Sequence, residues 1–106
     1  LWRQLLGMRP SRNHALIGAF AATIKARRLE LNLTQEDLAG RIELDRPYIT
    51  LMEAGTKQPT ISVLWRLANG LDLTVTELAS LVDRRLMRHQ RSTSEPPAAK
   101  RATARR

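Results

Sequence analysis

Apolar residues recur every three or four positions between residues 19 and 83, a spacing that predicts helices. They fall into five groups, separated by residues that favour helix ends. The groups are Phe20, Ile24, Leu29 and Leu31; Leu38, Ala39 and Ile42; Ile49 and Met52; Val63, Leu64, Leu67 and Ala68; and Leu78, Leu81 and Val82. The pattern predicts an all-α fold, a compact domain of five short helices.

Residues suited to helix ends stand between the first two groups. The first helix is expected to begin at about Ala15 or Gly18. It should end at Asn32, because asparagine tolerates the left-handed backbone that often follows a helix. Thr34 can cap the second helix, with Asp37 completing a capping box.

The second and third helices occupy the stretch from Leu33 to Gly55, joined by a short break. Asp45 is expected to cap the third helix, with Pro47 in the first turn, where a missing N–H costs nothing. Two short helices joined in this way are the minimal device for placing one helix in the major groove of DNA.

The last two helices have equally clear beginnings. Thr60 opens the fourth helix, and Gly70 closes it. Thr74 and Glu77 stand three residues apart, which predicts a second capping box at the start of the fifth helix.

The net charge of +8 is concentrated near the end of the sequence. Residues 1–83 hold 10 Lys and Arg against 9 Asp and Glu, whereas residues 84–106 hold 8 against 1. Beyond about Met87 apolar periodicity is lost and two prolines are adjacent, so we expect 84–106 to be a basic disordered tail. Residues 1–18 are expected to be an N-terminal extension, partly helical or disordered. DNA affinity of the folded part must then come from the placement of its charges.

Several functional classes are disfavoured by composition. The sequence has no cysteine, which excludes disulfides, thiolate nucleophiles and cysteine-based zinc sites. Neither His14 nor His89 has a second ligand at suitable spacing, so no metal site is expected. A nucleophile with a base and a Gly-rich phosphate loop are also missing, and we therefore expect no enzyme activity and no cofactor.

The first residues have some features of a signal peptide. Arg3, Arg9 and Arg12 precede an apolar stretch. That stretch is short and continues into the first helix, and no stretch approaches the roughly 20 apolar residues that span a bilayer. We therefore expect a cytoplasmic protein without a membrane contact.

Residues across the five predicted helices agree in register with a known family pattern. They are Arg28, Leu33, Thr34, Gln35, Leu38, Ala39, Tyr48, Ile49, Glu53, Gly55, Pro59, Leu67, Ala68 and the closing LTVTELASL. From Phe20 to Leu81 the chain thus resembles the lambda-repressor/Cro type of helix-turn-helix domain, also called the Xre family. The resemblance implies a lambda-repressor-like DNA-binding domain over residues 19–83, with the helix-turn-helix motif at about 34–54.

The resemblance also implies which residues of the third helix contact bases. The family's base readers fall on Arg46, Pro47 and Leu51, with Thr50 beside them. Arg46 can pair bidentately with guanine O6 and N7, although it could instead neutralise a phosphate. Pro47 offers no donor, and Leu51 can contact only a thymine methyl group or a protein partner.

Other positions are expected to bind phosphate or to stabilise the domain. Gln35 matches the family's phosphate anchor, although it can equally be an ordinary residue at a helix start. Arg28 and Glu53 match an ion pair that joins the first helix to the third. The further candidates for phosphate contacts are Thr34, Tyr48, Thr56 and Lys57; Tyr48 can equally be a packing residue.

One departure from the family lies in the turn between the two central helices. The family usually has glycine where this chain has Glu43. A residue other than glycine with positive φ costs about 1 kcal/mol or shifts the turn.

Together these features imply a sequence-specific DNA-binding transcriptional regulator, a repressor or autoregulator that occupies an operator on double-stranded DNA as a homodimer. Leu71, Val75 and Leu81 are candidates for the dimer surface and equally for the core. The basic tail would add salt-sensitive affinity. The alternative is an antitoxin or adaptor whose main contact is a protein partner such as a toxin.

Overall fold

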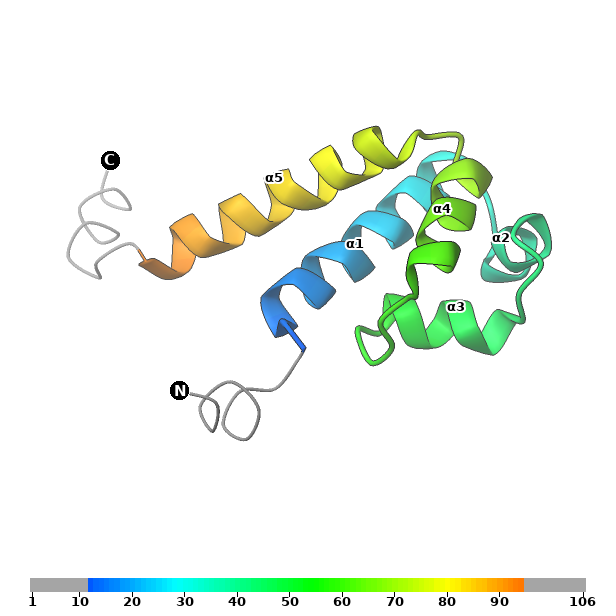
Figure 1. Cartoon of the computed structure of the whole chain (residues 1–106), viewed down its shortest axis with the longest axis horizontal. Helices are drawn as coiled ribbons and strands as arrows, with labels where there is room; N and C mark the ends of the chain where they lie inside the picture. Colours follow the sequence, from blue (N-terminus) through cyan, green and yellow to red (C-terminus); the bar gives the residue numbers. More distant parts are fainter. Residues whose placement is uncertain (1–11, 95–106) are drawn as a thin grey trace.

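Residues 12–94 are described by a computed structural model, and they form five α-helices, as predicted. The helices are α1 (His14–Glu30), α2 (Gln35–Arg41), α3 (Arg46–Glu53), α4 (Ile61–Gly70) and α5 (Val75–Ser94). In Figure 1, α1 lies between α5 along the top and α3 along the bottom, and α2 stands beside the start of α3. Within residues 12–94, no helix is both long enough and apolar enough to cross a membrane.

Two helices begin with the predicted capping boxes. At α2, Thr34 Oγ1 accepts from the Asp37 amide at 3.0 Å, and Asp37 Oδ2 accepts from the Thr34 amide at 2.9 Å. At α5, Thr74 and Glu77 exchange the same two hydrogen bonds, at 3.0 and 2.8 Å. The hydrogen bond from the threonine backbone amide, followed by one from the threonine hydroxyl, lowers the pKa of each carboxyl group, because both stabilise the ionised form.

The caps of two other helices differ from the prediction. The Asp45 side chain makes no capping hydrogen bond. Pro47 removes one of the two amides that an N-cap side chain normally reaches, and the remaining Tyr48 amide donates to the Asp45 carbonyl oxygen at 3.0 Å. Helix α1 begins at His14, slightly earlier than predicted, because Asn13 Oδ1 accepts from the Leu16 amide.

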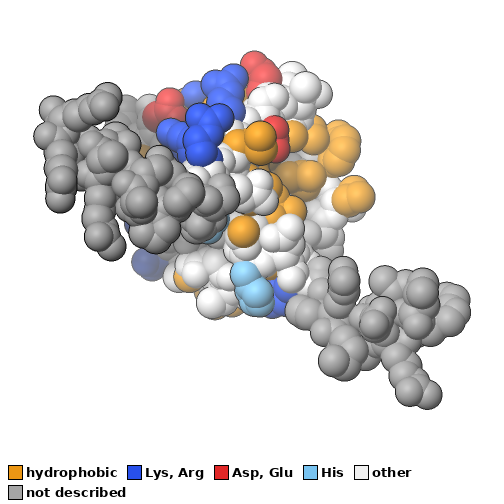
Figure 2. Space-filling view, turned by 90° about the vertical axis from the view of Figure 1, so that its left-hand side faces the viewer, with side chains coloured by type: hydrophobic (Ala, Val, Ile, Leu, Met, Phe, Trp, Pro, Cys, Tyr) orange, Lys and Arg blue, Asp and Glu red, His pale blue; other side chains and the backbone are white. Residues whose placement is uncertain are grey.

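The expected disordered tail from residue 84 is wrong for residues 84–94, which continue α5 to Ser94. This segment lacks glycine and proline and is rich in strong helix formers such as arginine, leucine and glutamine. Extending an existing helix costs little, since the unfavourable nucleation step is already complete. Figure 2 faces the end of the molecule where α5 finishes, and basic and hydrophobic side chains gather there in separate areas. The rest of the predicted tail lies outside the described residues, as does most of the predicted extension at 1–18.

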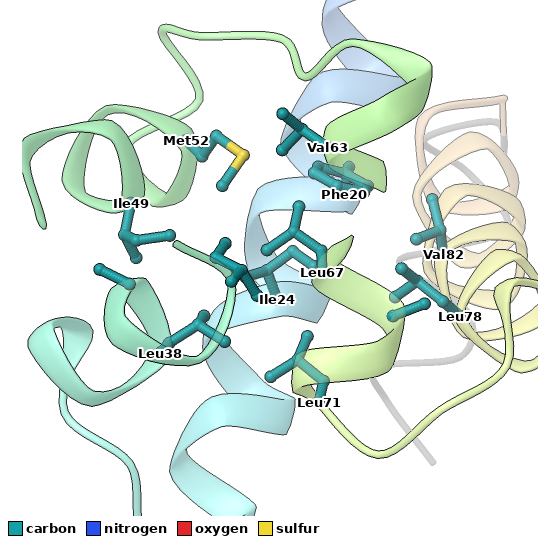
Figure 3. Close-up of a cluster of buried hydrophobic side chains, with 13 residues drawn as sticks. Phe20, Ile24, Leu38, Ile49, Met52, Val63, Leu67, Leu71, Leu78 and Val82 are labelled. Carbon is teal, nitrogen blue, oxygen red and sulfur yellow. The ribbon is translucent and has the colours of Figure 1, made fainter. Parts of the chain in front are cut away.

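All five helices contribute to one hydrophobic core, shown in Figure 3. The side chains at its centre, which are almost completely excluded from solvent, are Ile24, Leu38, Ile49, Met52, Leu67, Leu71 and Leu78. Leu71, a candidate for the dimer surface from sequence, is 0% exposed and therefore belongs to the core. The core fixes α3 against α1 and α2, and so determines which face of α3 remains in solvent.

The last residue of α4 packs too closely to tolerate a side chain. A Cβ atom added at Gly70 would lie 2.5 Å from Ile42 Cγ2, within the buried contact between α2 and α4. Gly70→Ala is therefore expected to lower the free energy of unfolding by about 1–3 kcal/mol through overpacking. Urea unfolding followed by circular dichroism measures this loss.

Gly18→Ala is the matched control, because Gly18 also lies in a helix but has no atom within 4 Å of an added Cβ. Alanine there should leave stability unchanged or raise it by up to about 1 kcal/mol. Equal effects of the two substitutions would contradict the predicted clash.

Candidate nucleic-acid interface

The turn between α2 and α3 has the geometry of a helix-turn-helix despite lacking glycine. Glu43 has φ of 58°, in the left-handed region where the family has glycine. The turn is closed by a 2.9 Å hydrogen bond from the Leu44 amide to the Ala39 carbonyl oxygen. The chain thus keeps the turn at a backbone cost of about 1–2 kcal/mol.

The four predicted base-contacting residues share one exposed face of α3. Arg46, Pro47 and Thr50 are exposed, and Leu51 is 45% exposed. The opposite face carries Ile49 and Met52, which are completely buried. Helix α3 therefore presents a surface whose orientation is fixed by its packing into the core.

A buried ion pair joins α1 to the end of α3, as the sequence predicted. Arg28 Nε and Nη2 donate to the two oxygens of Glu53 at 2.7 and 2.9 Å, and Arg28 Nη1 donates to the Leu33 carbonyl oxygen at 2.7 Å. The two side chains are only 8% and 4% exposed. Hydrogen bonding to Glu53 and attraction to its charge raise the pKa of Arg28, against the opposing effect of burial.

The ion pair continues into a hydrogen-bonded chain that reaches the exposed face of α3. Gln35 Nε2 donates to Glu53 Oε1 at 3.1 Å, and Thr50 Oγ1 donates to Gln35 Oε1 at 2.7 Å. Sequence reasoning assigned Gln35 and Thr50 separate roles and missed this connection. The amide of Gln35 retains a second N–H that can donate to a phosphate.

The remaining phosphate candidates lie at the two ends of the motif. Thr34 stands at the start of α2, where its hydroxyl accepts from the Asp37 amide and also stabilises the Asp37 carboxylate. Beyond α3, Lys57 Nζ lies 4.8 Å from the centre of the Tyr48 ring, a cation–π contact. Thr56 is a weaker candidate, since its hydroxyl donates to the Leu51 carbonyl oxygen at 3.1 Å.

Tyr48 packs partly against the core. Its role therefore includes packing, the alternative that the sequence left open.

Arg12 makes a contact with this region that the sequence did not predict. Arg12 Nη2 donates to the Thr56 carbonyl oxygen at 3.3 Å. No local pattern in the sequence indicated this contact, because it joins residues 44 positions apart. Arg12 thereby adds a positive charge beside the loop after α3.

No metal site is visible in the described part of the chain. Within residues 12–94, no three His, Cys, Asp or Glu side chains stand close enough together to hold a metal ion.

Comparison with known proteins identifies relatives of this arrangement. Residues 24–78 match a family model described as helix-turn-helix. The chain is 33% identical over 60 residues to the control protein C.MunI of Mycoplasma sp, a match that covers 57% of this chain and 81% of that protein. It is also 35% identical over 54 residues to YqaF, an HTH-type transcriptional regulator of Bacillus subtilis (strain 168), covering 49% of this chain and 71% of YqaF.

Solved structures of similar proteins have the same fold. The wild-type restriction-modification controller protein C.Esp1396I matches with a TM-score of 0.65 and 32% identity, over 68% of this chain and 95% of that one. C.Esp1396I has also been solved as a tetramer in complex with its natural 35 base-pair operator, a structure that matches equally well. The family model ends at residue 78, so most of α5 lies beyond it.

Proposed function

Because the chain belongs to the helix-turn-helix family, whose model matches residues 24–78, we propose that it is a sequence-specific DNA-binding transcriptional regulator. It acts as a repressor or autoregulator by occupying an operator as a dimer. The observation that carries the proposal is the exposed face of α3, held in place by the buried pair of Arg28 and Glu53. The operator complex of the related C.Esp1396I supports it.

In the proposed complex, α3 enters the major groove and Arg46 is the main reader. The Arg46 side chain is exposed, and its guanidinium forms no hydrogen bond or ion pair with the part of the chain that the structure describes. Its planar guanidinium can donate two parallel hydrogen bonds to guanine. Thr50 and Leu51 add one polar and one apolar contact, the latter to a thymine methyl group, and Pro47 contributes shape alone.

Phosphate contacts on both sides of α3 position it in the groove. Gln35 donates from the α2 side, and Lys57 with the Tyr48 hydroxyl binds from the other side. The Gln35 contact is well supported, because hydrogen bonds to Glu53 and Thr50 hold its amide in one orientation. These contacts set the register of the helix without reading sequence.

Selection from a pool of random duplexes tests the proposal directly. The intact chain is expected to enrich a pseudo-palindrome with half-sites one helical turn apart, about 34 Å. Enrichment of no sequence at low salt would refute operator binding and favour the alternative of a protein-interaction module.

The dimer surface is proposed to be an apolar groove where the start of α1, the start of α4 and α5 meet. The groove has a volume of about 710 Å³ and is lined by Leu16, Ile61, Val75 and Leu86 among others. Ile61 is 74% exposed, an unusual exposure for an isoleucine in a monomer. Of the candidates from sequence, Val75 lines this groove, whereas Leu81 lines a separate cleft.

Ile61→Glu is expected to raise the dimer dissociation constant by about 30-fold or more, since a charge replaces a central apolar contact. Sedimentation equilibrium measures this change. Leu29→Glu is the control, because Leu29 is also exposed but lies outside the groove. A dimer of unchanged strength in Ile61→Glu would exclude this surface.

A further inference from the structure

Helix α5 has two faces of opposite character along its second half. Val82 and Leu86 line the apolar groove proposed for the dimer. Arg84 follows Val82 by two positions, and Arg88 follows Leu86 by two positions. Each arginine therefore lies about 200° further around the helix than the apolar residue before it. Helix α5 therefore presents an arginine row, defined as Arg84 and Arg88, on the side away from the dimer groove.

The arginine row forms one wall of a cleft whose other wall is the last two turns of α1. The cleft has a volume of about 520 Å³, and the charged residues lining it are Arg27, Arg84, Arg85, Arg88, Arg91, Glu30 and Asp83. Five positive charges thus face two negative ones. Figure 2 shows basic side chains gathered on this end of the molecule.

Within residues 12–94, no ion pair or side-chain hydrogen bond neutralises Arg84 or Arg88. Glu30 is 3.9 Å from Arg27, and Arg27 is further held by the carbonyl oxygen of Leu71 at 3.0 Å. Asp83 borders the apolar groove as well as this cleft. An anion is therefore the chemical group that would relieve the repulsion within the row.

We propose that the arginine row is a second, sequence-independent nucleic-acid contact, which binds the phosphate backbone of a duplex segment other than the one read by α3. Spacing by one helical turn, about 5.4 Å, places successive guanidinium groups along a line. Arginine provides donors and no acceptors, and it pairs bidentately with phosphate. A row of donors matches a phosphate backbone better than the mixed donors and acceptors of a protein surface.

The position of α5 makes the bound segment a separate one. Figures 1 and 3 both place α5 and α3 on different sides of the molecule, with α1 and α4 between them. A duplex seated on α3 therefore does not run along the arginine row of the same protomer. The protein would hold two duplex segments at once, an inference that rests on the proposed function for the segment at α3.

The test is capture of a second duplex. Protein is bound to an immobilised duplex that carries the enriched sequence, and a fluorescent 30 base-pair duplex lacking that sequence is added. Arg84→Gln/Arg88→Gln is expected to reduce capture of the fluorescent duplex by about tenfold or more. The plot of log affinity against log salt for that duplex should lose about two units of slope. Glutamine preserves helix propensity, so α5 should remain helical by circular dichroism.

Lys25→Gln/Arg66→Gln is the matched control, since it removes the same charge from exposed positions of α1 and α4. Capture should change by less than about twofold. Unchanged capture in the arginine-row variant, or an equal loss in the control, would overturn the inference. Binding of the same two proteins to polyglutamate tests for an acidic protein partner. If the arginine-row variant loses polyglutamate binding while its duplex capture is unchanged, the inference is overturned in favour of such a partner.

Failure of the inference about the arginine row is distinguishable from failure of the proposed function. The arginine-row variant should enrich the same sequence as the intact chain. If the intact chain enriches none, operator binding fails. The salt slope measured by direct titration of the 30 base-pair duplex still decides whether the row binds a phosphate backbone.

Discussion

Glu53→Ala is expected to lower the free energy of unfolding by about 3–5 kcal/mol, a loss that leaves a small domain marginally folded. The substitution leaves the Arg28 guanidinium buried without its anion, and the Leu33 carbonyl oxygen becomes its remaining partner. It also removes the acceptor of Gln35. Urea unfolding followed by circular dichroism measures the effect.

Glu36→Ala provides the matched control, because Glu36 is an exposed carboxylate in the first turn of α2. It should change stability by about 0.5 kcal/mol or less. Replacing both members of the pair, as Arg28→Leu/Glu53→Leu, should cost less than the sum of the two single changes, since no charge is then left unpaired. A loss below about 1 kcal/mol in Glu53→Ala would show that the pair contributes little.

Arg46→Ala is expected to remove the preference for one base pair in each half-site, by about 1–3 kcal/mol, or about 5- to 150-fold. The reason is that Arg46 is the main hydrogen-bond donor on the exposed face of α3, beside Pro47 and Leu51, which have none to offer. Affinities for the enriched duplex and for single-base variants of it measure the change.

Two outcomes separate reading from simple neutralisation. If Arg46 reads guanine, the variant should bind all sequences at the affected position about equally. If it only neutralises a phosphate, affinity should fall uniformly and the ranking of sequences should persist. Arg66→Ala is the control, an exposed arginine of α4 outside the proposed interface, and should preserve both affinity and ranking.

Local chemistry made much of the fold predictable. The capping boxes of Thr34 and Thr74 involve residues three positions apart, so the sequence displays them completely. The predicted side-chain cap at Asp45 is absent, because Pro47 lacks the amide N–H that could donate to the Asp45 side chain. The cap and the proline each follow a local rule, but the two rules exclude one another here. The full length of α5 was not predicted, because the prediction required apolar side chains that could be buried. A helix of strong helix formers that extends an existing helix needs little burial of this kind.

The site was less accessible to sequence reasoning, because its contacts are long-range. The pairing of Arg28 with Glu53 spans 25 positions and was predicted only through the family resemblance. The bond from Thr50 to Gln35 depends on the crossing of α2 and α3, which no spacing rule fixes. Leu71, Val75 and Leu81 were interchangeable in sequence, yet the fold sends them to the core, the apolar groove and the cleft.

The hydrogen bonds of Thr50 determine the polarity of its contact with a base. Its hydroxyl lies 2.7 Å from Gln35 Oε1 and 3.2 Å from the Arg46 carbonyl oxygen, and both are acceptors. The single hydroxyl hydrogen is therefore directed into the protein, and only oxygen lone pairs remain for DNA. In the proposed complex, Thr50 would favour the amino groups of adenine and cytosine and disfavour the carbonyl oxygens of thymine and guanine. Helix α3 would thus carry two readers of opposite polarity, a donor at Arg46 and an acceptor one turn later.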